Sequence, residues 1–354
     1  MNPQDTQKII SAISHMDIGQ ADLMEVCGTH TMSIAKSGLK SMLPAGIRLL
    51  SGPGCPVCVT PEETIDAILD LSMENDVIIA TYGDMIRVPG SRQGDNLASR
   101  RAQGARVEMV YSAMDSVTLA AENPEKQVVF LGAGFETTAP GTAAAVKTAA
   151  EKKIKNYSVF SMLKKVEPAL RALIEEEGFN VKGFICPGHV ATIIGEKGFR
   201  FLAEEYGMPS VISGFEPADI LISVYRLAKQ INEGRAVLEN EYARAVRPEG
   251  NPAALSIMDG CLEPEDDLWR GLGMIPDSGL KLKKAYAAYD AGAKFGIRII
   301  QSEKKSICRC GDVIRGKISP SMCPLFGTVC TPEDPVGPCM VSSEGACAAE
   351  FKYS

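Results

Sequence analysis

Short apolar runs alternate with amphipathic stretches through most of this chain. The runs at 47–51 and 77–82 predict strands, because they are short, apolar and bounded by turn residues. Between them, Thr60-Pro61-Glu62-Glu63 predicts the start of a helix that runs to about Glu74. In this interpretation Thr is the N-cap, Pro occupies the first helical position and the last Glu closes a capping box.

A second series of the same kind begins after residue 126. The expected elements are strands at 127–131, 157–162, 182–186 and 210–213, and helices at 140–151, at 167–177, from about 191, and at 217–232. Such alternation predicts parallel sheets with right-handed crossovers. We therefore expect an α/β fold with two parallel-sheet α/β domains, at 1–122 and 123–240.

The pattern changes from about Arg247. Proline and glycine become frequent, strand patterns become rare, and after Cys308 the chain is rich in cysteine, proline and glycine. A bound metal centre can supply the folding free energy that such a segment cannot obtain from apolar burial. We therefore expect a third, small Cys-rich domain at 241–354, organised by a metal centre.

The composition excludes several classes of function. The 354 residues are 45% hydrophobic, and the net charge of −7 gives no general electrostatic reason to bind nucleic acid or an anionic membrane. No apolar run approaches the roughly 20 residues that span a bilayer, and the polar N-terminus shows no signal-peptide pattern. These features predict a cytoplasmic protein that binds neither nucleic acid nor a membrane.

Eleven cysteines are the unusual feature of the composition. In a reducing compartment, clustered cysteines more often bind metal or carry out redox chemistry than form structural disulfides. Six of them follow residue 307, and two form a Cys-x-x-Cys. The other three, Cys27, Cys186 and Cys261, are isolated.

Four unusual strings fall at predicted strand-to-helix junctions. They are Cys27-Gly28-Thr29-His30, Gly52-Pro53-Gly54-Cys55-Pro56-Val57-Cys58, Gly134-Phe135-Glu136-Thr137-Thr138 and Cys186-Pro187-Gly188-His189-Val190. Ligands of doubly wound folds bind outside the carboxyl ends of the strands. We therefore expect the four strings to converge on one cleft between two domains, whereas the alternative is that they are only tight loops.

Cys27 and His30 have the spacing Cys-x-x-His. The two side chains could share a metal, or His30 could activate the thiol by taking its proton. A helix that starts near His30 is also expected to lower the pKa of Cys27. The alternative is a buried, inert cysteine. His189 is a second candidate, since it also lies beside a cysteine-containing loop.

Cys55 and Cys58 have the spacing of thiol–disulfide oxidoreductases, just before a predicted helix. We expect a short, exposed redox disulfide. Half of a zinc site is the alternative, but no second Cys-x-x-Cys completes it. The string that contains Glu136 lacks the Gly-Lys-Ser/Thr of a Walker loop, so Glu136 is instead a candidate for proton transfer or hydrogen bonding.

The cysteines of the tail have irregular, loop-rich spacing. Thiolates placed in this way suit an iron–sulfur cluster, whose irons need ligands from several directions. A structural zinc site is the alternative, and visible absorption would separate the two because zinc is colourless.

Taken together, these strings resemble the HypD family, and the resemblance extends to the tail from Cys323-Pro-Leu-Phe-Gly to Gly-Ala-Cys347. It covers essentially the whole chain. It implies two α/β domains and a third domain with a [4Fe–4S] cluster. It also implies a complex with the small chaperone HypC, on which the Fe(CN)2(CO) unit of nickel–iron hydrogenase is built as a transient cargo, with cyanide delivered by HypE.

The resemblance also implies roles for individual residues. The cysteine of Cys-Gly-Thr-His, here Cys27, is the ligand of the assembled iron. The family spacing Cys-x14-Cys-x6-Cys-x16-Cys fits the cluster ligands Cys308, Cys323, Cys330 and Cys347. Cys310 and Cys339 lie inside that span and are alternates. An iron–sulfur-dependent thiol–disulfide reductase, in which Cys27 is incidental, is the rival function.

Overall fold

Strands from distant parts of the chain build the first sheet, which we call sheet A. Its strands are β1 (Ala21–Glu25), β2 (Ile47–Ser51), β7 (Gly183–Pro187), β8 (Ser210–Ser213) and β9 (Leu238–Asn240). In the computed structural model, which describes residues 2–299 and 306–353, their order is β2-β1-β7-β8-β9 and every neighbouring pair is parallel.

The second sheet, sheet B, is mixed. Its strands are β3 (Val77–Thr81), β4 (Arg106–Met109), β5 (Gln127–Gly134), β6 (Tyr157–Lys164), β10 (Leu262–Trp269) and β11 (Gly273–Leu282). The order is β10-β11-β6-β5-β3-β4, with β6, β5, β3 and β4 parallel and the β10–β11 hairpin antiparallel. All five residues of β3 are buried, which explains its continuous apolar sequence.

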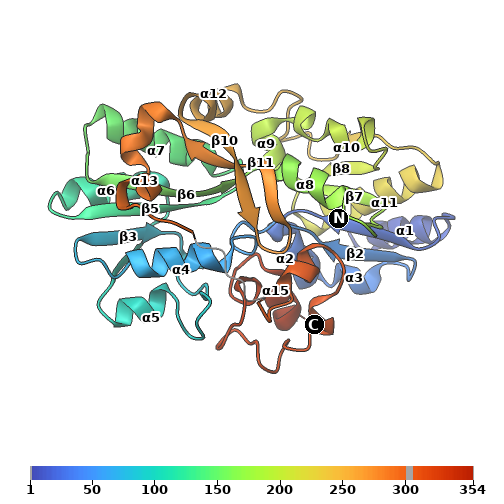
Figure 1. The fold of residues 1–354 in the computed structure, drawn as a ribbon. Helices are drawn as coiled ribbons and strands as arrows, with labels where there is room; N and C mark the ends of the chain where they lie inside the picture. The colour runs from blue at the N-terminus through green and yellow to red at the C-terminus, as the bar shows by residue number, and fades with distance from the viewer. Residues whose placement is uncertain (1, 300–305, 354) are drawn as a thin grey trace.

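Helices cover both faces of each sheet (Figure 1). Those around sheet A are α1 (Pro3–Ser14), α2 (Gly28–Ser37), α3 (Leu39–Met42) and α11 (Pro217–Asn232) on one face, and α8 (Val166–Ile174), α9 (Gly188–Ile194) and α10 (Arg200–Glu204) on the other. Those around sheet B are α4 (Glu62–Leu71), α5 (Leu97–Ala102) and α13 (Ala291–Phe295) on one face, and α6 (Ala113–Glu122), α7 (Ala139–Glu151) and α12 (Pro252–Cys261) on the other.

The two sheets do not follow the expected division of the chain. The expected domain 1–122 supplies β1 and β2 to sheet A but β3 and β4 to sheet B, and 123–240 likewise supplies strands to both. The hairpin β10–β11, in the segment where we expected few strands, extends sheet B. Alternating strands and helices predict parallel pairing, but they do not say which sheet each strand joins.

The helix after the Cys-x-x-Cys begins later than expected. α4 starts at Glu62, with Pro61 in the N-cap position and no side-chain cap hydrogen bond. The predicted capping by Thr60 is wrong, because its hydroxyl donates to Pro56 O at 2.9 Å instead. The other predicted elements from 127 to 232 are confirmed, with ends that differ by a few residues.

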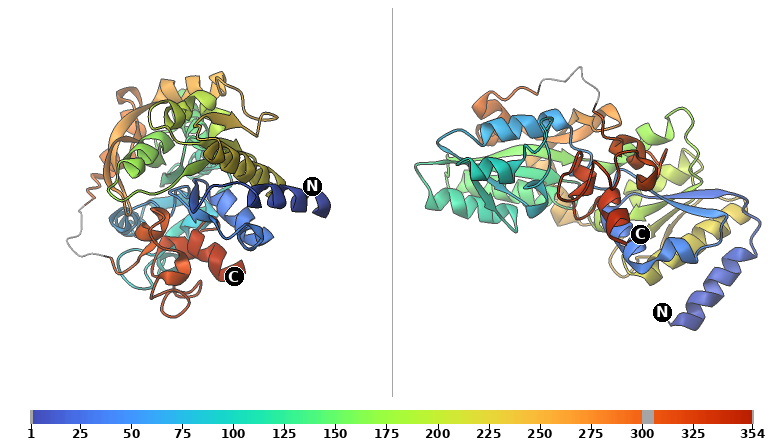
Figure 2. Two further views of the ribbon diagram at one scale, coloured as in Figure 1. Left: turned by 90° about the vertical axis from the view of Figure 1, so that its right-hand side faces the viewer. Right: turned by 90° about the horizontal axis from the view of Figure 1, so that it is seen from below.

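The tail lies across the junction of the two sheets and their helices (Figures 1 and 2). It contains α14 (Cys310–Ile314) and α15 (Ala346–Tyr353), and α15 packs against α2. Short 3-10 helices are found at Gly83–Met85, Glu196–Gly198, Lys284–Tyr289, Pro320–Met322 and Pro338–Met340. Within residues 2–299 and 306–353, no helix is both long and apolar enough to cross a membrane.

Candidate functional site

The four motif loops meet at one cavity, at the carboxyl ends of strands from both sheets. Its volume is about 280 Å³. Six segments line it, and their representatives are Cys27, Pro56, Asp84, Phe135, His189 and Glu344. The predicted convergence of the four strings is therefore confirmed. A larger cavity of about 670 Å³, at the first residues of β3 and β5, contains none of the predicted site residues.

Cys27 occupies the N-cap position of α2, two residues after the last residue of β1. Its backbone N–H donates to Glu25 Oε2 at 3.0 Å, and the N–H of Gly28 donates to Gly54 O at 3.1 Å. Burial, followed by the charge of Glu344, raises the pKa of Cys27 to about 12. The backbone N–H groups of Thr29 and His30, in the first turn of α2, do lower this pKa as predicted, but loss of hydration outweighs them and the net shift is upward. A metal cation at the sulfur would reverse the direction of the shift.

Two glycines let other segments approach Cys27. A Cβ on Gly54 would lie 2.2 Å from the backbone N of Cys27, and a Cβ on Gly28 would lie 2.2 Å from Cβ of Glu344. No real Cβ fits at such distances, so both positions require glycine. Because Gly54 has no side chain, the Cys-x-x-Cys loop can pack against Cys27. Because Gly28 has none, the tail can pack against the start of α2.

His30 does not face the cavity. Its Nε2 donates to Gly214 O at 2.8 Å, its Nδ1 has no hydrogen-bond partner among the described residues, and burial lowers its pKa to about 4. The hypothesis that His30 takes the proton of Cys27 finds no support, since the ring is held by the Gly214 carbonyl instead. Cys27 has an extended backbone (φ −151°) outside the helix, so helical neighbour spacing does not apply to this pair.

His189 does face the cavity, and an aromatic stack fixes its ring. Phe215 lies between the two imidazoles, with its centroid 3.7 Å from that of His189 and 4.7 Å from that of His30. Burial lowers the pKa of His189. The structure therefore places one imidazole, His189, in the lining that also contains Cys27.

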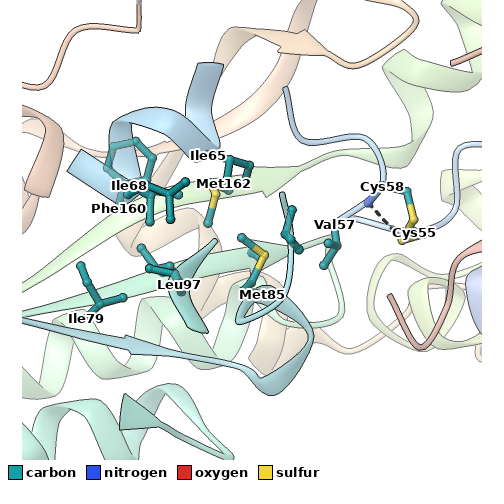
Figure 3. Close-up of a cluster of buried hydrophobic side chains, with 14 of the residues drawn as sticks. Cys55, Val57, Cys58, Ile65, Ile68, Ile79, Met85, Leu97, Phe160 and Met162 are labelled. Atoms are coloured by element: carbon teal, nitrogen blue, oxygen red, sulfur yellow. Dashed lines mark hydrogen bonds between the residues drawn. A yellow bond between two sulfur atoms is a disulfide. The ribbon is translucent and has the colours of Figure 1, made fainter. Parts of the chain in front are cut away.

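Cys55 and Cys58 form a disulfide with a Cα–Cα distance of 5.2 Å. The predicted exposure is wrong, because Cys55 is 5% and Cys58 1% exposed. Figure 3 shows the pair at the end of a row of buried side chains that includes Val57 and Met85. The N–H of Cys58 donates to Cys55 Sγ at 3.1 Å. Val57, but neither sulfur, lines the Cys27 cavity.

Glu136 points to a different place from its neighbours in the same loop. Phe135 and Thr137 line the Cys27 cavity, whereas Glu136 lines a second cavity of about 430 Å³ together with Lys165. Its Oε1 accepts the N–H of Val166 at 3.0 Å, its Oε2 has no partner among the described residues, and burial raises its pKa to about 7. Glu136 therefore has no contact through which it could transfer a proton at Cys27.

The tail thiols lie near one another in pairs. The N–H of Cys310 points to Cys308 Sγ at 3.5 Å, and the N–H of Cys347 donates to Cys339 Sγ at 3.2 Å. A Cβ on Gly337 would lie 2.3 Å from Cys308 Sγ. Among the described residues, no group of three or more side chains is arranged to hold a metal ion.

The remaining tail cysteines are Cys323 and Cys330. Cys330 Sγ accepts the N–H of Val336 at 3.3 Å, and burial raises the pKa of this thiol. N–H donors at cysteine sulfurs are among the contacts by which proteins tune iron–sulfur clusters. The donor set of the tail, six thiols with backbone N–H groups directed at several sulfurs, fits a thiolate-bound cluster in its chemistry.

Hydrogen bonds of Ser342–Glu344 hold the tail against the residues that line the cavity. The hydroxyls of Ser342 and Ser343 and the N–H of Ser343 donate to Asp84 Oδ2 at 3.1, 2.7 and 2.9 Å. The hydroxyl of Thr29 donates to Glu344 Oε1 at 2.9 Å. These contacts link the tail to the loop after β3 and to the first turn of α2.

Glu25 and Asp84 are site residues that the sequence prediction missed. Glu25 is buried at the end of β1, where its carboxylate accepts the N–H of Cys27 and the hydroxyl of Thr31, and burial raises its pKa to about 7. The available signal was an acidic residue at the end of an apolar strand for Glu25, and an acidic residue in the turn that follows one for Asp84. Cys186 and Cys261 are buried and do not line the cavity.

Known proteins resemble this chain over nearly its whole length. Residues 4–354 match the HypD family model, described as "Hydrogenase formation hypA family". The chain is 46% identical to hydrogenase maturation factor HypD2 of Bradyrhizobium diazoefficiens, over 93% of this chain and 88% of that protein. It is 45% identical to HypD of Rhodobacter capsulatus and 42% identical to HypD of Cupriavidus necator, in each case over 94% of this chain and 89% of the relative. This chain therefore belongs to the HypD family of hydrogenase maturation factors.

Proposed function

We propose that this chain is the scaffold on which the Fe(CN)2(CO) unit of a nickel–iron hydrogenase is assembled, with Cys27 as a thiolate ligand of the iron. The observation that supports the proposal is the 280 Å³ cavity that contains Cys27 and His189 and is lined by every motif loop and by the tail. The iron unit is cargo, so it must be held firmly and later released. A cavity formed by several separate segments can open for both steps.

The chemistry of the cavity suits this cargo. Iron(II) that carries cyanide and carbon monoxide is a soft centre, for which thiolate is a suitable ligand. A second thiolate would come from a HypC-type chaperone, and dissociation of the two proteins would free the iron. His189 and backbone N–H groups at the start of α2 could donate hydrogen bonds to cyanide, which a HypE-type partner would deliver.

We propose Cys308, Cys323, Cys330 and Cys347 as the residues that would hold a [4Fe–4S] cluster. When bound, the cluster supplies one-electron chemistry. Cys310 lies close to Cys308, and Cys339 lies close to Cys347. Cys310 and Cys339 are therefore alternative ligands of the cluster. A structural zinc site remains the competing occupant, and visible absorption of anaerobically purified protein distinguishes the two.

The Cys55–Cys58 disulfide would carry electrons between the tail and the Cys27 site. Cys55 Sγ lies 3.3 Å from Ser342 Oγ of the tail, while Val57 of the same loop lines the cavity. The same contact supports the second candidate function, a stand-alone thiol–disulfide reductase. In that case the disulfide is the active group and Cys27 has no part in the reaction.

Maturation of nickel–iron hydrogenase in cells tests the proposal. Cys27→Ala should abolish hydrogenase activity in a strain without its own copy of the protein, because the iron loses its thiolate ligand. Cys261→Ala is the matched control, since Cys261 is also a buried cysteine but does not line the cavity. If Cys27→Ala supports normal maturation while replacement of Cys55 does not, the reductase is the better description.

A further inference from the structure

Ser342 connects a sulfur of the disulfide to a carboxylate. Its Oγ lies 3.3 Å from Cys55 Sγ and 3.1 Å from Asp84 Oδ2, and it accepts the N–H of Glu344 at 3.2 Å. The side chain of Ser342 is buried. Three elements that are far apart in the sequence therefore meet at one hydroxyl: the Cys-x-x-Cys loop, the loop after β3 and the tail.

The hydrogen bonds of this hydroxyl have a defined direction. A serine hydroxyl has one hydrogen to donate and two lone pairs that accept. The hydrogen goes to Asp84, because a carboxylate can only accept. One lone pair takes the N–H of Glu344, and the other is free to accept the S–H of Cys55 when the disulfide is reduced. In the reduced pair, Cys55 thus donates to Ser342, and Ser342 donates to the Asp84 carboxylate.

The surroundings favour Cys55 over Cys58 as the sulfur that exchanges its proton. Cys55 Sγ also accepts the N–H of Cys58 at 3.1 Å, a contact that stabilises negative charge on this sulfur. Asp84 lines the Cys27 cavity and is held in place by the N–H and hydroxyl of Ser343 at 2.9 and 2.7 Å. A proton that reaches Asp84 can therefore pass to and from the cavity.

We propose that Ser342 and Asp84 form a proton relay for Cys55, with Ser342 in contact with the reacting sulfur and Asp84 acting through it. The relay rests on the redox role proposed above for the Cys55–Cys58 pair. When a dithiol reduces the pair, a reductant sulfur bonds to Cys58, the Cys55–Cys58 bond breaks, and Cys55 leaves with the electron pair.

The protons of this reaction then balance. The first reductant thiol releases its proton to the Asp84 carboxylate. Ser342 then passes its own hydrogen to Cys55 and takes the proton from Asp84, which returns to the carboxylate form. The second reductant thiol closes the reductant's own disulfide and displaces Cys58 as a thiol. The reductant loses two electrons and two protons, and the cysteine pair gains both.

The rate of disulfide reduction by dithiothreitol tests the relay. Full-length protein, purified anaerobically with its tail centre, is mixed with dithiothreitol over a range of pH. Samples are quenched with acid, free thiols are blocked under denaturing conditions, and the mass of the peptide that contains Cys55 and Cys58 gives the reduced fraction. The variants are Ser342→Ala, Asp84→Asn and their double variant. Thr60→Val is the matched control, because its hydroxyl bonds to Pro56 O in the same loop without contact to a sulfur.

Ser342→Ala and Asp84→Asn should each slow reduction by about 10²-fold, the lower end of what general acid–base catalysis contributes. The double variant should be no slower than either single variant, because both remove one pathway. After correction for the thiolate fraction of dithiothreitol, the wild-type rate should still vary with pH and the variant rates should not. Thr60→Val should behave as wild type.

Two other results would overturn the relay. In the first, the rate losses of the two single variants add up in the double variant, or both single variants react at the wild-type rate. Either outcome would show that Ser342 and Asp84 only hold the tail. The redox role of the Cys55–Cys58 pair would then stand without the relay. If the wild-type protein shows no reducible Cys55–Cys58 pair at all, the relay and the proposed redox role fail together.

Discussion

At the scale of single residues, burial decides the chemistry of the candidate site more than neighbours in the sequence do. The spacing of Cys27 and His30 predicted a shared proton or metal, yet the ring of His30 is bound to Gly214 O on a different loop. His189, predicted from a loop 162 positions after Cys27, shares the cavity with Cys27. Sequence spacing identified the right loops, but it could not give the direction of each side chain, because that depends on contacts between distant segments.

The effect of burial on the pKa of a single residue can be tested at Glu136. Its pKa is about 7 in the folded chain, against an ordinary value of 4.5, because it is buried. Between these values the folded state holds a proton that the unfolded state releases, so this contribution to stability is present below pH 4.5 and is lost as pH rises to about 7.

Glu136→Gln should remove this pH dependence. Relative to the variant, the wild type should lose on the order of 3 kcal/mol of unfolding free energy across the same window, as an upper bound. Urea unfolding at a series of pH values measures the difference. Parallel pH profiles of the two proteins would show that the carboxyl titrates normally.

At the scale of elements, the repeated strand–helix pattern was sufficient for the middle of the chain. The hairpin β10–β11 was missed because β10 has the sequence LEPEDDLW, in which four acidic residues obscure the strand pattern. The predicted cap of α4 was wrong because the Thr60 hydroxyl binds within the Cys-x-x-Cys turn. Local hydrogen bonding of serine and threonine competes with capping, and sequence alone does not show which contact wins.

The Cys-x-x-Cys loop leads to a prediction at the scale of elements. A disulfide that closes so short a ring should stabilise the fold by no more than about 2 kcal/mol through chain entropy. The double variant Cys55→Ala/Cys58→Ala should therefore remain folded, with an unfolding free energy lowered by about that amount, while maturation of hydrogenase is lost. Alanine is used because a serine hydroxyl would be buried in an apolar cluster.

Urea unfolding and a cellular maturation assay on the same double variant check this expectation. A loss of stability of several times that size, with maturation falling in proportion, would mean that the disulfide is a structural crosslink. Normal maturation would remove the pair from electron transfer.

At the scale of the whole molecule, the chain crosses from one sheet to the other and back, and its tail lies across their junction. The sequence predicted two α/β units and a Cys-rich tail. It did not predict that each of the two sheets contains strands from both 1–122 and 123–240. This topology explains the position of the site, since Cys27 follows a strand of sheet A and Asp84 follows a strand of sheet B. The contact of the tail with Asp84 and Thr29 could not be predicted, because it joins residues more than 250 positions apart.

The central claim is that the iron unit is assembled on Cys27, and the infrared spectrum of this chain purified anaerobically in complex with a HypC-type chaperone tests it most directly. The wild-type complex should show bands of iron-bound cyanide and carbon monoxide. The Cys27→Ala complex should form and keep the visible absorption of its tail centre, but it should lack those bands, whereas Cys261→Ala should keep them. Iron–cyanide bands of normal intensity in the Cys27→Ala complex would contradict the account.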